Sequence, residues 1–80
     1  MLNPTLRRAK HLLRALGTAR ASETQLRREL DKGTVTPSRA EDLKAALRLA
    51  GEAVDRAANA WNTVAASLTA GEIRRVAASL

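Results

Sequence analysis

Apolar residues recur at alternating spacings of three and four over residues 40–68, and this stripe constrains the fold more than any other feature of the chain. Its members are Ala40, Leu43, Leu47, Ala50, Val54, Ala57, Trp61, Val64 and Leu68. Because an α-helix has about 3.6 residues per turn, this spacing keeps the apolar side chains on one narrow face. Such a helix is expected to pack lengthwise against another helix.

Two proline-containing segments predict where long helices begin. Asn3-Pro4 and Thr36-Pro37 each place a capping side chain directly before a proline, and proline fits the first turn of a helix. We therefore expect one helix over about 4–32 and a second over about 37–68. Glu41 and Asp42 follow the second start, where acidic side chains suit the positive end of the helix dipole.

The first predicted helix carries an apolar stripe of its own. Its members are Leu2, Thr5, Ala9, Leu12, Leu16, Ala19, Glu23, Leu26 and Leu30. Gly33 suits the left-handed position that ends a helix, and a short connection makes consecutive helices antiparallel neighbours. Folding the chain about residues 34–35 then aligns the two stripes. The expected pairs are Leu30 with Ala40, Leu26 with Leu43, Ala19 with Ala50, Leu16 with Val54, Leu12 with Ala57, Ala9 with Trp61 and Leu6 with Val64.

Two further segments carry helix-boundary signals. Thr69-Ala70-Gly71-Glu72 has the spacing of a capping box, which predicts a break and a short third helix over about 70–80. Its expected apolar face is Ile73, Val76, Ala77 and Leu80. Gly17, followed by the capping residue Ser22, could also end a helix and leave a helix-turn-helix. We favour an unbroken helix there, because the stripe continues in register across Gly17.

A chain of 80 residues without cysteine has limited means to stabilise itself. A compact fold of this size buries only about 60% of its unfolded surface, and an elongated fold buries less. We therefore expect an all-α protein, a long antiparallel helical hairpin plus a short C-terminal helix in a single domain over residues 1–80. Its expected core is Leu43, Leu47, Val54, Trp61 and Val64.

The apolar residues outside the two stripes predict self-association. We expect a homo-oligomer, with a dimer favoured, or docking on a larger protein partner. The interface candidates are Leu6, Leu13, Leu49, Ile73 and Leu80. The leading functional hypothesis is accordingly a non-enzymatic interaction or assembly module, an adaptor or oligomeric subunit.

Basic residues give the chain a formal charge of +6, and they gather near its start. Residues 1–32 carry eight bases and three acids, whereas residues 33–68 carry four of each. The candidate residues for an anionic partner are Arg7, Arg8, Lys10, Arg14 and Arg20. Such a segment attracts nucleic acid, acidic lipid or an acidic protein face. The alternative function is therefore a nucleic-acid-binding protein that contacts phosphates, and a third is membrane-surface binding by residues 4–17.

Glu23 is the one charged member of the first apolar stripe. Arg20 and Arg27 lie three residues before it and four after it, a spacing that suits ion pairs within a helix. One hypothesis is a buried polar layer that fixes the helix register. The other is that the long side chain reaches solvent at the edge of the stripe.

No motif for catalysis or for a cofactor occurs in the sequence. There is no nucleophile with a base, no glycine-rich phosphate loop and no metal-ligand spacing, and His11 is the single histidine. We therefore expect no enzymatic activity, no metal and no small-molecule substrate. The lack of cysteine and of a secretory signal favours an intracellular protein, which we place in the cytoplasm. An Arg-rich, acid-free start is also typical of a mitochondrial presequence.

Overall fold

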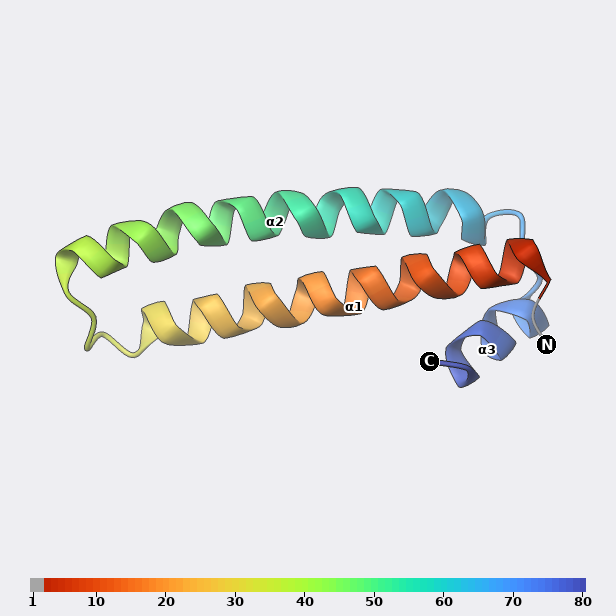
Figure 1. Ribbon diagram of the computed structural model, residues 1–80, viewed down its shortest axis with the longest axis horizontal. Coiled ribbons are helices and arrows are strands. Elements are labelled where there is room, and N and C mark those ends of the chain that lie inside the picture. Colours follow the sequence, from red (N-terminus) through yellow and green to blue (C-terminus); the bar gives the residue numbers. More distant parts are fainter. Residues whose placement is uncertain (1–2) are drawn as a thin grey trace.

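Three helices make up the part of the chain that the computed structural model describes, residues 3–80. They are α1 (Pro4–Asp31), α2 (Pro37–Ala65) and α3 (Ala70–Ala78). Helices α1 and α2 run antiparallel along the whole molecule, and α3 folds back beside the first half of α1 (Figure 1). The molecule measures 49 × 19 × 17 Å. The prediction of an all-α hairpin with a short C-terminal helix is confirmed; Leu2 lies outside the described residues.

Each helix begins at the capping residue that the sequence predicts. Asn3 Oδ1 accepts a hydrogen bond from the Leu6 amide at 2.8 Å. Thr36 Oγ1 accepts one from the Arg39 amide at 3.2 Å. Thr69 forms the full capping box with Glu72. These side chains satisfy backbone N–H groups that have no partner within the first turn of a helix.

The hairpin turn depends on Gly33. This residue has a φ of +69°, a left-handed conformation that other L-residues adopt only at a cost. The Gly33 amide donates back to the Leu30 carbonyl at 3.4 Å, and α1 ends at Asp31. The predicted boundary at Lys32 is therefore correct to one residue.

Three other expectations about the helices have clear outcomes. Helix α1 passes through Gly17 without a break, so the unbroken helix is confirmed and a helix-turn-helix with its turn there is wrong. Helix α2 ends at Ala65, three residues before the predicted position, because residues 66–68 tighten into a turn. In that turn the Leu68 amide bonds to the Ala65 carbonyl at 3.0 Å, a spacing of three residues.

The expected dipole role of Glu41 and Asp42 is wrong. The first turn of α2 holds no acidic residue, since both carboxylates lie one turn further along. The helix dipole acts on side chains within the first turn and falls off beyond it. Glu41 instead pairs with Lys44 on the exposed surface, at 3.4 Å.

Burial is concentrated where α3 joins the hairpin. Leu6, Ala9 and Val76 are buried against one another, and we call these three residues the α3 cluster. The half-buried side chains that pack on it are Leu13, Trp61, Val64 and Leu68. The predicted neighbours Ala9 with Trp61 and Leu6 with Val64 thus belong to one packed group, which supports the predicted register.

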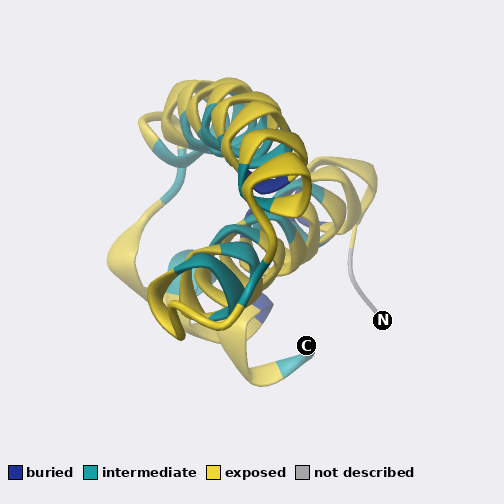
Figure 2. Ribbon diagram, turned by 90° about the vertical axis from the view of Figure 1, so that its left-hand side faces the viewer, coloured by how far each residue is buried: buried dark blue, intermediate teal, exposed yellow. Residues whose placement is uncertain are grey.

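Elsewhere the hairpin is thin. Leu16 and Leu43 are the other fully buried hydrophobic residues among those described. Of the five predicted core residues only Leu43 is fully buried; the rest are half-buried. Figure 2 shows this pattern, with small buried patches among half-buried and exposed positions. Two helices enclose only the line between them, so their flanks stay open.

Candidate interaction surfaces

The charges of the folded molecule separate along its length. Because Ala9 packs near Trp61 and Leu6 near Val64, Arg14 lies at about the level of Arg56. We call residues 3–14 and 56–80 the basic end, and residues 15–55 the neutral half. The basic end has seven bases and one acid, and the neutral half has seven of each. The whole net charge of +6 therefore lies at the basic end.

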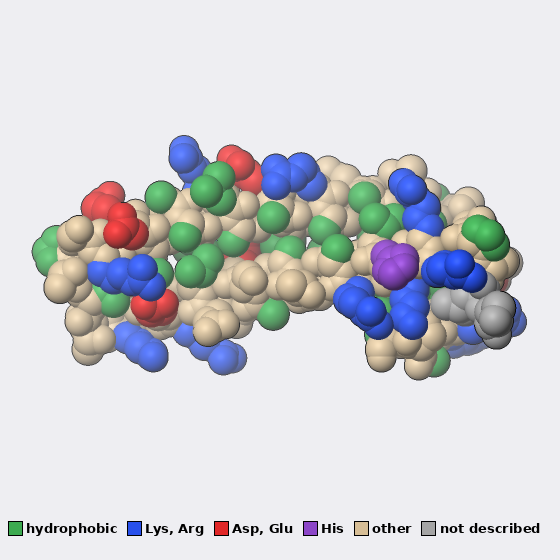
Figure 3. Space-filling model, in the orientation of Figure 1, with side chains coloured by type: hydrophobic (Ala, Val, Ile, Leu, Met, Phe, Trp, Pro, Cys, Tyr) green, Lys and Arg blue, Asp and Glu red, His purple; other side chains and the backbone are tan. Residues whose placement is uncertain are grey.

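Helix α3 adds further cations at the same end of the molecule as the predicted basic site. The bases of this end are Arg7, Arg8, Lys10, Arg14, Arg56, Arg74 and Arg75. Four of them are direct sequence neighbours of a residue in the α3 cluster: Arg7, Arg8, Lys10 and Arg75. In Figure 3 the basic side chains surround the histidine over this end of the molecule.

The structure thus groups four of the five predicted anion-site residues and separates the fifth. Arg20 lies in the neutral half, further along α1 than the region that α3 covers. Sequence reasoning missed Arg74 and Arg75, which lie some 60 residues away from the basic start of the chain. The apolar spacing of Ile73 and Val76 predicted that α3 packs, but not on which part of the hairpin.

Acidic side chains do little to neutralise the basic end. Among the described residues, no carboxylate oxygen lies close enough to the Arg8, Arg14 or Arg74 guanidinium to form an ion pair, that is, within 4.0 Å. The single acid of this end, Glu72, accepts the Thr69 amide at 2.9 Å in the capping box. The first turn of α1 has no acid either. Cations near a helix N-terminus are unfavourable by about 0.3–1 kcal/mol each.

A shallow hollow lies on the outer side of α1 within the basic end. It has a volume of about 460 Å³ and is lined by Pro4, Arg7, Arg8, His11 and Leu12. The guanidinium groups at its rim are planar donors that match phosphate or carboxylate oxygens. The hollow is therefore suited to contact with an anionic group at the surface.

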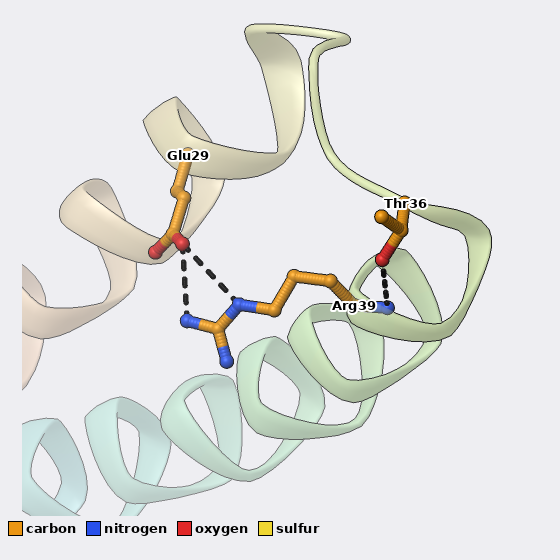
Figure 4. Close-up of polar contacts among 3 residues, drawn as sticks. All are labelled: Glu29, Thr36 and Arg39. Carbon is orange, nitrogen blue, oxygen red and sulfur yellow. Dashed lines mark hydrogen bonds and ion pairs between the residues drawn. The ribbon is translucent and has the colours of Figure 1, made fainter.

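The neutral half is joined by an ion pair across the hairpin. Arg39 Nη2 and Nε approach Glu29 Oε1 at 3.0 and 3.3 Å, next to the Thr36 cap (Figure 4). Both side chains remain partly exposed, at 53% and 39%. A pair of this exposure stabilises a protein by about 0.2–1 kcal/mol. Its main effect is to link the end of α1 to the start of α2.

Glu23 is half-buried and lies against α2. A Cβ atom placed on Gly51 would be 3.3 Å from Glu23 Oε2, so the missing side chain of Gly51 gives this carboxylate room. The predicted ion pairs with Arg20 and Arg27 are wrong: among the described residues Glu23 forms no ion pair within 4.0 Å. The expected spacing along the helix is present, but the carboxylate turns towards the partner helix.

The five predicted interface residues have different surroundings. Leu6 is buried in the α3 cluster and Leu13 packs against it, so the chain's own third helix covers part of both. Ile73 is half-buried. Leu49 and Leu80 are exposed by 59% and 54%, respectively. Hydrophobic side chains also follow the line between α1 and α2 and the flank of α2 in Figure 3.

The molecule exposes more surface than a compact protein of its mass. Its accessible area is 5643 Å². A compact monomer of the same mass would expose about 4,700 Å². The radius of gyration is 16.1 Å. A compact chain of this length would have about 12 Å. The excess area, about 900 Å², arises because a third helix covers only one end of the hairpin.

Comparison with known proteins adds no assignment. No family model, curated protein or solved structure matches this chain. Within residues 3–80, no helix combines the length and the hydropathy needed to cross a bilayer. In the same range, no three histidine or acidic side chains gather as ligands for a metal ion.

Proposed function

We propose that the protein is a non-enzymatic helical assembly module that pairs with a second copy of itself. The observation that carries this proposal is the excess surface. Each partner in a typical stable complex covers about 800 Å², and the excess over a compact monomer is about 900 Å². A second copy would thus restore the burial that the elongated chain lacks.

The neutral half is the part of the molecule best suited to this contact. It has only two helices, and its half-buried apolar residues lie open beside the α1–α2 line. On the α2 side these are Ala46, Leu47, Ala50 and Ala53, next to the exposed Ala45 and Leu49. The neutral half has no net charge, so two copies can approach there without the repulsion that two basic ends would meet.

Pairing of two hairpins gives a four-helix arrangement. The apolar stripe of each long helix would then face two neighbouring helices, as it does in a four-helix bundle. The small residues along α2 allow close approach of the helices. The same surface would also fit a different, larger helical protein. The solution mass of the chain distinguishes that partner from a second copy.

A charge placed on the proposed interface tests the proposal. We expect Leu49→Glu to convert the dimer to a monomer in multi-angle light scattering, because a carboxylate would have to be buried without a partner. Ala21→Glu is the matched control: it adds the same charge at an exposed position of α1 and should leave the dimer intact. A wild-type chain that is monomeric at every concentration would contradict self-association and leave the larger partner.

A further inference from the structure

We propose that the basic end binds the phosphate backbone of nucleic acid, through a site that forms only when α3 docks on α1. The cations of the predicted N-terminal site and those of α3 are far apart in sequence. The α3 cluster places both groups at the same end of the molecule, since Val76 packs on Leu6 and Ala9. This inference does not depend on the proposed dimer.

The spacing of the cations suits a duplex backbone. Arg7 and Arg14 are two turns apart on α1, which corresponds to about 10 Å along the helix. Over that length a DNA duplex presents about six phosphates. Lys10 and His11 lie between the two arginines on the same side of α1, and Arg75 adjoins the cluster from α3. These phosphates are divided between the two strands, and the cations of α1 and α3 are spaced to reach more than one of them.

The contacts would be to phosphates and not to bases. Trp61 is the single tryptophan of a chain that has no tyrosine or phenylalanine, and it is half-buried against the α3 cluster. It is therefore not free to stack on a base in the way that sequence-tolerant single-strand binders use aromatic side chains. Backbone contacts without base contacts give affinity that depends on salt but little on sequence.

A membrane surface fits the structure less well. An amphipathic helix lies in a bilayer with its apolar face among the lipids. The apolar face of α1 over residues 4–17 is occupied by the hairpin and α3: Leu6, Ala9 and Leu16 are buried. Binding in this mode would require α1 to leave its own fold, whereas binding to phosphates uses arginine side chains that are already exposed.

The test is binding of the full chain to a fluorescent DNA duplex of arbitrary sequence, followed by anisotropy. With four phosphate contacts, we expect the affinity to fall roughly a hundredfold between about 50 and 200 mM salt. The double variant Arg74→Glu/Arg75→Glu should weaken binding at least tenfold. Arg27→Glu/Arg28→Glu is the matched control, because it makes the same charge change at exposed positions of the neutral half and should leave the salt dependence unchanged.

A second variant separates binding from folding. Arg8→Glu/Arg14→Glu replaces two cations at exposed positions in the first half of α1, so no buried contact is lost. We expect this variant to keep its helix content by circular dichroism and still to lose binding at least tenfold. If the basic-end variants and the control variant lost equal affinity for the duplex, the proposal would be overturned, because net charge alone would then explain the binding.

Two other outcomes would also overturn it. One is the absence of binding to the duplex at about 50 mM salt, where phosphate contacts are strong. The other is binding to vesicles that contain phosphatidylserine together with no binding to the duplex, which would assign the basic end to a lipid surface. Sequence-independent duplex binding that is lost with the cations of α3 is the result that supports the site.

Discussion

The basic end and the neutral half differ in packing and in charge, and the two differences run in opposite directions. The basic end has three helices and holds three of the five residues that are fully buried within residues 3–80, yet its charges are unbalanced. The neutral half has two helices and little burial, yet its charges are balanced and it contains the two ion pairs formed between described side chains. Apolar packing thus holds together cations that would otherwise repel one another.

This contrast bears on function. A protein needs no cluster of like charges for stability, and such a cluster opposes folding. An open apolar flank is likewise unfavourable in an isolated monomer. The two regions therefore suggest two different partners: an anion at the basic end and a protein surface at the neutral half.

The largest change in the free energy of unfolding is expected at the basic end, where packing is densest, and a smaller one in the neutral half. Leu6→Ala removes a buried side chain from the α3 cluster and should lower the free energy of unfolding by about 3 kcal/mol. Leu30→Ala makes the same change at a half-buried position of the neutral half and should cost about 1 kcal/mol. Urea denaturation at one fixed protein concentration measures both. Equal losses would show that the two regions are packed alike.

Removal of a cap tests how independently α3 forms. Thr69→Ala removes one hydrogen bond of the capping box and should destabilise α3 by about 1 kcal/mol. Amide exchange over residues 70–78 should then accelerate, because α3 has only 9 residues. Thr36→Ala is the control at the start of α2, where faster exchange should stay within the first turn. Unchanged exchange in α3 would mean that packing alone holds this helix.

Alanine substitutions at two glycines within the long helices should raise the free energy of unfolding, by less than the Leu6 substitution lowers it. Gly17 is exposed and has open space around it, so Gly17→Ala should raise the free energy of unfolding by about 0.5–1 kcal/mol. The gain from Gly51→Ala should be smaller, because the new methyl group would displace the Glu23 carboxylate. Thermal unfolding followed by circular dichroism compares the two, and an equal gain would show that Glu23 moves aside freely.

The smallest expected effect is that of the ion pair in the neutral half. Glu29→Gln should lower the free energy of unfolding by less than about 1 kcal/mol, because both partners are partly exposed. The difference from the wild type should shrink as salt is added, since the pair is screened. A loss of several kcal/mol that persists in high salt would mean that this pair determines the hairpin.

The local features of the fold could be predicted from the sequence because their causes are local. A capping side chain such as Asn3 or Thr69 acts within three residues, and the left-handed Gly33 determines the turn by itself. The alternating stripes predicted the register because two independent patterns had to match.

The candidate site could be predicted only in part because it depends on the path of the chain after α2. The early end of α2 at Ala65 and the turn that follows direct α3 towards the start of α1, and no local pattern specifies that direction. Arg74 and Arg75 were missed for this reason. The orientation of Glu23 was also not predictable, because it depends on the space beside Gly51 in the other helix.

The solution mass of the unmodified chain tests pairing through the neutral half. The proposed assembly predicts that sedimentation equilibrium gives a mass approaching twice 8.6 kDa as the protein concentration rises. The Leu49→Glu variant should remain at 8.6 kDa over the same range. A wild-type mass of 8.6 kDa at every concentration, with the helices intact by circular dichroism, would contradict pairing through the neutral half.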